Sequence, residues 1–155
     1  MFALSKNGER LDQVSDEVRL ASAVTADLMS ELISVACERL PAVNRAEKPA
    51  PVRRLIESSA WTEAALALVE IELPDWQLRR LVFEDGQWHC SLSKQVNLPM
   101  EFDDTADASH QVLPLAILGA FIEVRRRPMV ARETSTAVPR VQSLGGQAIC
   151  CDNFY

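Results

Sequence analysis

Two histidines are the side chains of this 155-residue sequence best suited to proton transfer near neutral pH. His89 and His110 could each act as a general base. A nucleophilic site at His89 would also need a serine or cysteine within hydrogen-bonding reach and a third group that orients the ring. In the hairpin predicted below, Cys90 points away from His89. An arrangement of Ser91, His89 and an aspartate remains open from spacing alone.

The cysteines of this chain do not have the spacing of a known metal or disulfide site; they are Cys37, Cys90, Cys150 and Cys151. Structural zinc sites take ligands in pairs two to four residues apart, and adjacent cysteines rarely bind one ion. The sparse pattern is also unlike a disulfide framework. A thiol-based sensor that uses Cys150 and Cys151 is an alternative hypothesis, although no cation next to them in the sequence would promote thiolate formation.

Carboxylates that could bind a hard cation cluster at Glu101, Asp103, Asp104 and Asp107. A calcium loop starting at Asp103 would need glycine at its sixth position and glutamate at its twelfth. The sequence has Ala108 and Pro114 there, so the calcium motif fails. We interpret the carboxylates as the start of a helix, where negative charge is stabilising without an ion. No glycine motif for phosphate binding is present. We therefore expect no metal, no cofactor and no catalytic residue of a recognisable type.

The net charge of −6 argues against nucleic acid as a partner, because the phosphate backbone repels an acidic protein. The one basic cluster, Arg125 to Arg127, has no stacking aromatics beside it and is typical of a helix C-terminus. No apolar run approaches the roughly 18 residues of a membrane span, and the first residues do not look like a secretory signal. We expect a cytoplasmic protein that binds neither nucleic acid nor membrane.

Hydrophobic spacing predicts two long amphipathic helices, at about 16–40 and from Asp103 to about Arg127. Pro114 should kink the second helix or mark a new first turn. Between them we expect a Pro-rich connector at 41–52, a short helix from Pro51 to Ser58, and a change from helix to strand near residue 66. Residues 1–127 form the single predicted domain, and 128–155 a disordered tail.

Two extended runs meet at Asp85-Gly86, a dipeptide that favours a two-residue hairpin turn. Counting outward pairs Phe83 with Trp88, Leu81 with Cys90 and Arg79 with Leu92 on one face. We expect Phe83, Trp88, Leu81 and Leu92 to be core side chains. The other face pairs Val82 with His89, Arg80 with Ser91 and Leu78 with Ser93. Residues 68–73 would add a third strand beside the first.

These elements predict an α+β fold in which a small antiparallel meander of two to three strands packs against two long helices. Two helices can cover one face of such a sheet fully and the other only in part. We therefore expect the mixed face to bind a protein partner or a second copy of the chain. The candidate binding residues are Leu78, Arg80, Val82, His89 and Ser91.

The block from Trp61 to Glu123 resembles small uncharacterised proteins of rhizobia and related alphaproteobacteria. The resemblance rests on the segments Leu73-Pro74-Asp75-Trp76, Trp88 to Ser93 and Leu115 to Ala120. It implies a bacterial, cytoplasmic accessory protein and brings no activity or ligand with it. The acidic helix–sheet–helix order is similar, in architecture alone, to chaperones that hold secretion substrates as dimers.

The function that these features favour is a non-enzymatic protein-interaction or accessory module, of an adaptor or chaperone-like kind. The alternatives are a small enzyme centred on His89 or His110 and the thiol sensor described above. An enzyme should show a pocket that collects histidine and carboxylates, whereas an adaptor should show an exposed apolar patch or a free sheet edge.

Overall fold

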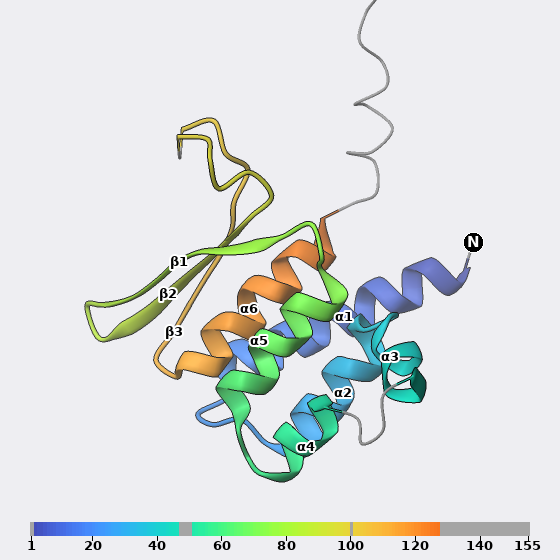
Figure 1. Cartoon of the computed structure of the whole chain (residues 1–155). Helices are drawn as coiled ribbons and strands as arrows, with labels where there is room; N and C mark the ends of the chain where they lie inside the picture. The colour runs from blue at the N-terminus through green and yellow to red at the C-terminus, as the bar shows by residue number, and fades with distance from the viewer. Residues whose placement is uncertain (1, 47–50, 100, 128–155) are drawn as a thin grey trace, which may run out of the picture.

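A computed structural model of the chain describes residues 2–46, 51–99 and 101–127 (Figure 1). Within these residues the chain forms six helices and one three-stranded antiparallel sheet, which confirms the predicted α+β class. The elements in chain order are α1 (Phe2–Leu20), α2 (Ala26–Ala36), α3 (Leu40–Ala46), α4 (Pro51–Glu57), α5 (Trp61–Glu72), β1 (Gln77–Glu84), β2 (Gln87–Ser93), β3 (Ala106–His110) and α6 (Leu113–Arg126).

The single helix predicted at 16–40 is wrong, because these residues include the end of α1, all of α2 and the first residue of α3. The first of the two breaks has a clear local cause. The break lies at residues 21–25, and Thr25 starts α2: its backbone is extended and its hydroxyl oxygen accepts a hydrogen bond from the backbone N–H of Leu28 at 3.2 Å. The apolar spacing continues through the break, because Val14 and Val18 of α1 are buried together with the apolar face of α2. Spacing alone therefore could not show where the chain turns.

The predicted connector at 41–52 is largely helical, which corrects that expectation. Residues 41–46 belong to α3. Pro41 is tolerated in the first turn of this helix, because backbone N–H groups there make no hydrogen bond within the helix and the missing N–H of proline costs nothing. The short helix expected from Pro51 is confirmed as α4, with Val52 buried and Leu55 half-buried. Residues 47–50 and the predicted disordered tail at 128–155 lie outside the described residues.

The helix α5 continues to Glu72, so the predicted change to a strand near residue 66 is wrong. Its buried side chains recur at helical spacing and are Ala64, Ala65, Leu68, Val69 and Glu72. The β-branched residues that suggested a strand are accommodated because Val69 is buried in the core and Ile71 packs against it. The third strand of the sheet therefore comes from another part of the chain.

The β1–β2 hairpin confirms the predicted turn, with Asp85 and Gly86 at φ of 53° and 79°. Phe83 pairs with Trp88, Leu81 with Cys90, Val82 with His89 and Arg80 with Ser91, all as expected. A bulge between Leu78 and Arg80 then shifts the register. Leu78 therefore faces Leu92, so the predicted partners of Leu78 and Arg79, which were Ser93 and Leu92, are wrong.

The strand β3 occupies residues where the second long helix was predicted to begin. It pairs antiparallel with β2, which lies between β1 and β3. α6 starts only at Leu113, and Pro114 lies in its first turn, the second of the two outcomes expected for this proline. Ala108 of β3 lies so close to α6 that a Cβ added at Gly119 would be 2.9 Å from the Ala108 Cβ. Small residues therefore bring β3 and α6 together.

The helix α6 covers one face of β2 and β3 and itself packs on α1 and α5, whereas β1 packs mainly on β2 (Figure 1). The hairpin consequently extends away from the helical body. Of the four predicted core side chains, Leu92 is buried, Leu81 and Trp88 are half-buried, and Phe83 is 59% exposed. The expectation for Phe83 is wrong because the strand that carries it lies beyond the cover of α6.

Candidate functional site

The sheet face turned away from α6 is mostly polar. Pairing across the three strands places on it Arg80, Val82, His89, Ser91, Asp107 and Ser109. Four of the five predicted binding residues therefore share this face. The fifth, Leu78, follows the bulge onto the face of Leu92 and is 40% exposed.

His89 is held by two hydrogen bonds on this face. Its Nδ1 lies 2.6 Å from the Ser109 hydroxyl oxygen, and its Nε2 lies 3.3 Å from the backbone carbonyl oxygen of Glu84. A carbonyl oxygen can only accept, so in the neutral ring Nε2 carries the proton and Nδ1 accepts the proton of the serine hydroxyl. This is the geometry of a base beside a nucleophile. Ser109 is not among the candidate residues predicted from the sequence, because its segment was expected to be helical.

The arrangement of Ser91, His89 and an aspartate that the spacing left open does not form. The Ser91 hydroxyl donates to the Asp107 carboxylate, which also accepts from the Thr105 hydroxyl at 2.7 Å. Ser91 is itself only 6% exposed. These contacts fix β2 to β3 and leave Ser91 little surface with which to meet a partner.

The other histidine has a local role in the turn before α6. The Nδ1 of His110 accepts a hydrogen bond from the backbone N–H of Val112 at 2.9 Å. The pairing of His110 with Trp88 places it on the helix side of the sheet, on the face opposite His89. The structure therefore does not bring the two histidines into one site.

Arg79, in the bulge of β1, binds the loop that follows β2. Its guanidinium donates to the Asp103 carboxylate and to the backbone carbonyls of Gln95 at 3.3 Å and Leu98 at 2.7 Å. The Ser93 hydroxyl donates to the same carboxylate at 2.5 Å. Asp103 thus ties the loop after β2 to the bulge, which corrects the expectation that it caps a helix.

Large apolar side chains are exposed on the hairpin and on the loop beside it. Phe83 is 59% exposed and contacts the half-buried Trp88, with ring centroids 5.2 Å apart and planes inclined by 54°. Leu98 and Phe102 of the loop are 37% and 74% exposed. On the hairpin, strand pairing puts four apolar residues on one face of the sheet: Leu78, Leu81, Phe83 and Trp88. Apolar side chains gathered at one place on a surface are typical of a binding site for another protein.

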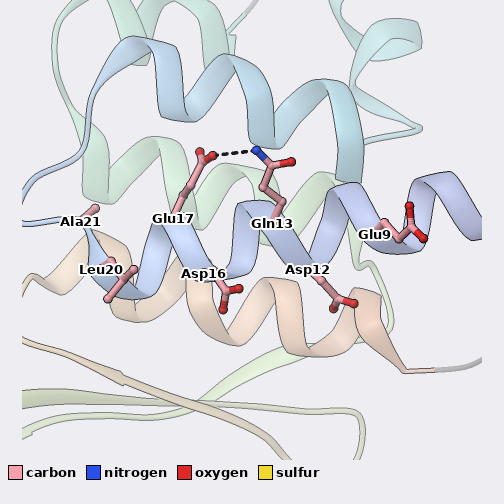
Figure 2. Close-up of a pocket in the computed structure, with 7 residues that line it drawn as sticks. All are labelled: Glu9, Asp12, Gln13, Asp16, Glu17, Leu20 and Ala21. Carbon is pink, nitrogen blue, oxygen red and sulfur yellow. Dashed lines mark hydrogen bonds between the residues drawn. The ribbon is translucent and has the colours of Figure 1, made fainter.

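A second surface feature is a shallow hollow along α1, shown in Figure 2. It is lined by Glu9, Asp12, Gln13, Asp16, Glu17, Leu20 and Ala21. Two of its carboxylates are paired with arginines, Asp16 with Arg19 at 2.6 Å and Asp12 with Arg126 at 3.0 Å. The lining contains no histidine, cysteine or serine, so the hollow offers neither a base of the histidine type nor a nucleophile of the serine or cysteine type.

The two cysteines of the described region are poor nucleophiles. Burial raises the pKa of Cys37 to about 12, with a further contribution from the Glu72 carboxylate. Burial, followed by the charge of Asp107, raises the pKa of Cys90 to about 12. Both thiols are therefore protonated at neutral pH. Cys150 and Cys151, on which the sensor hypothesis rests, lie outside the described residues.

Within the described ranges, no three side chains of the histidine, cysteine, aspartate and glutamate types are grouped so that they could hold a metal ion. No helix in that part of the chain is both long and apolar enough to cross a membrane. Comparison of the chain with protein-family models, with curated proteins and with solved structures found no match.

Proposed function

We propose that this chain is a non-enzymatic protein-interaction module of the adaptor or accessory kind, and that its β1–β2 hairpin is the binding element. The observation that carries the proposal is the exposure of Phe83, at 59%, on a strand that extends past the helical body (Figure 1). Covering an exposed aromatic side chain lowers the free energy of the complex, and aromatic residues are enriched in protein interfaces.

The contact residues of this proposal lie on β1. Arg80 and Val82 are available on the polar face, and Leu78 and Phe83 on the other. His89 and Ser91, which the sequence also suggested, are bonded to β3 and would act behind β1 as its support. A strand that offers apolar residues between charged ones provides both affinity and orientation.

Site-specific photocrosslinking tests this proposal. The photoreactive residue p-benzoylphenylalanine replaces Phe83 in one variant and Leu66 in a control, because Leu66 is an exposed leucine on α5, away from the hairpin. We expect a discrete light-dependent adduct from position 83, lost when Val82→Glu is added, and no matching adduct from position 66. Equal yields at the two positions, or an adduct that survives Val82→Glu, would show that the hairpin is not the binding element.

A small enzyme centred on His89 is the second candidate, because the 2.6 Å contact with Ser109 polarises that hydroxyl. Such a pair would cleave an ester: the serine oxygen bonds to the acyl carbon, His89 takes the hydroxyl proton, and the alcohol leaves with that proton. The Asp107 carboxylate on the same face opposes this, because it disfavours the negative charge that develops in acyl transfer. A fluorophosphonate probe distinguishes the two functions: labelling that Ser109→Ala abolishes would support the enzyme, and no labelling would leave the pair a structural contact.

A further inference from the structure

No other strand of the described residues pairs with the outer edge of β1. From Arg80 to Glu84 the sequence of this strand is complementary to itself. We propose that the partner at the hairpin is a second copy of this chain, and that the two β1 strands pair antiparallel about a two-fold axis at Val82. The two three-stranded sheets would then join into one continuous sheet. This inference rests on the proposed function and names the partner for the same binding element.

The backbone of this segment is ready to pair. The two-residue turn makes Glu84 and Gln87 a hydrogen-bonded pair, and hydrogen-bonded and non-hydrogen-bonded pairs alternate from there along the hairpin. The N–H and C=O groups of the even-numbered residues in 80–84 therefore point to β2. Those of Leu81 and Phe83 point to the free edge, where a partner strand could bond them.

A two-fold axis at Val82 gives every side chain of the segment a suitable partner. Val82 lies opposite Val82 of the partner subunit, and Phe83 lies opposite Leu81 of the partner subunit, which covers the exposed ring. Arg80 lies opposite Glu84 of the partner subunit, and this ion pair occurs twice. Opposite charges and apolar pairs directly across antiparallel strands are both stabilising.

Neighbouring positions of the axis lose this complementarity. With the axis at Arg80, two guanidinium groups would face each other. With the axis at Phe83, Val82 would face Glu84 of the partner subunit. With the axis at Leu81, Val82 would face Arg80 of the partner subunit. Like charges and unpaired charges opposite apolar residues are unfavourable. The sequence of β1 therefore selects one register.

The same charges explain why this edge would pair with a second copy of the chain rather than with an unrelated strand. A charged edge strand normally resists pairing with unrelated strands. Within one subunit the Arg80 Nη2 and Glu84 Oε2 atoms are 3.5 Å apart. Their side chains are 48% and 61% exposed, so both can turn toward a partner. The bulge between Leu78 and Arg80 limits regular pairing to the segment after it. Because that segment is short, we expect a reversible dimer that dissociates on dilution.

Charge reversal in the purified full-length chain tests the register. Arg80→Glu and Glu84→Arg each place like charges opposite each other twice, so each should raise the dimer dissociation constant at least about tenfold by sedimentation velocity. The double variant should recover the dimer. An equimolar mixture of the two single variants should form a heterodimer, seen by native mass spectrometry. The matched control is Arg53→Glu, which breaks an exposed arginine–glutamate pair on α4 and should leave the dimer unchanged.

A cysteine crosslink gives an independent readout. In a background with Cys150 and Cys151 replaced by serine, Val82→Cys should form a covalent dimer on oxidation, and Glu63→Cys on α5 should not. A wild-type chain that is monomeric at all concentrations would overturn the inference, as would single variants that fail to complement each other. If position 83 still crosslinks to a different protein, the proposed function stands without the dimer. If the chain is monomeric and position 83 yields no adduct, both fail.

Discussion

The buried carboxylate of Glu72 should be one of the largest single contributors to the stability of the helical body. Its side chain is fully buried and accepts four hydrogen bonds. One oxygen accepts from the backbone N–H groups of Arg39 and Leu40 at 2.8 and 2.6 Å. The other accepts from the N–H of Glu38 at 3.0 Å and from the Arg125 guanidinium at 2.6 Å. A residue of α5 thus satisfies the start of α3 and the end of α6.

Glu72→Ala would remove the partner of three backbone N–H groups and of the Arg125 guanidinium; the N–H of Leu40 is buried, and the other three donors are partly buried. Hydrogen bonds to charged groups contribute about 1.5–3 kcal/mol each, but the contributions of bonds that share one carboxylate are not additive. Breaking a buried ion pair costs about 3–5 kcal/mol. We expect a loss of about 3–5 kcal/mol, a large part of the 5–15 kcal/mol typical of a domain. Arg125→Ala leaves the three backbone bonds in place and should cost less, about 1.5–3 kcal/mol.

Urea denaturation followed by circular dichroism measures these changes. The control is Glu70→Ala, an exposed glutamate of α5, which should stay within about 0.5 kcal/mol of the wild type. The double variant of Glu72 and Arg125 should lose less than the sum of the single variants, because the two side chains share one bond. A loss below about 1 kcal/mol for Glu72→Ala would refute the reasoning.

Further substitutions test the packing. Phe83→Ser should lower the free energy of unfolding by less than about 1 kcal/mol, because Phe83 is 59% exposed. Leu92→Ala, at a fully buried position, should lower it by about 2–5 kcal/mol. Urea titrations measure both changes. Gly119→Ala should destabilise the chain through the 2.9 Å approach to Ala108, and Ala108→Gly should restore part of the loss in thermal melting. Burial raises the pKa of the Cys90 thiol to about 12 in the folded chain, whereas in the unfolded chain the thiol ionises at its ordinary pKa of 9.0. The stability from this group is therefore present below about pH 9 and lost as the pH rises toward 12, and Cys90→Ala should lessen that fall in denaturation midpoint.

The sequence by itself determined those elements whose causes lie within a few residues. The Asp85-Gly86 turn needs positive φ angles that this dipeptide tolerates, so the hairpin and its inner register could be predicted. Arg125 and Arg126 lie in the last turn of α6 as expected, because the helix dipole acts locally. Pro51 at the start of α4 follows from the fixed φ of proline.

The tertiary structure decided the elements whose local preference is weak. Residues 68–72 alternate like a strand, yet α5 continues because Leu68 and Glu72 are buried against elements from elsewhere in the chain. Ala106 and Ala108 have little preference for a strand and form β3 because their small side chains fit beneath α6. Only that strand places Ser109 beside His89. Whether a side chain of β1 is buried depends on how far α6 extends across the sheet, a distance that no nearby residue specifies.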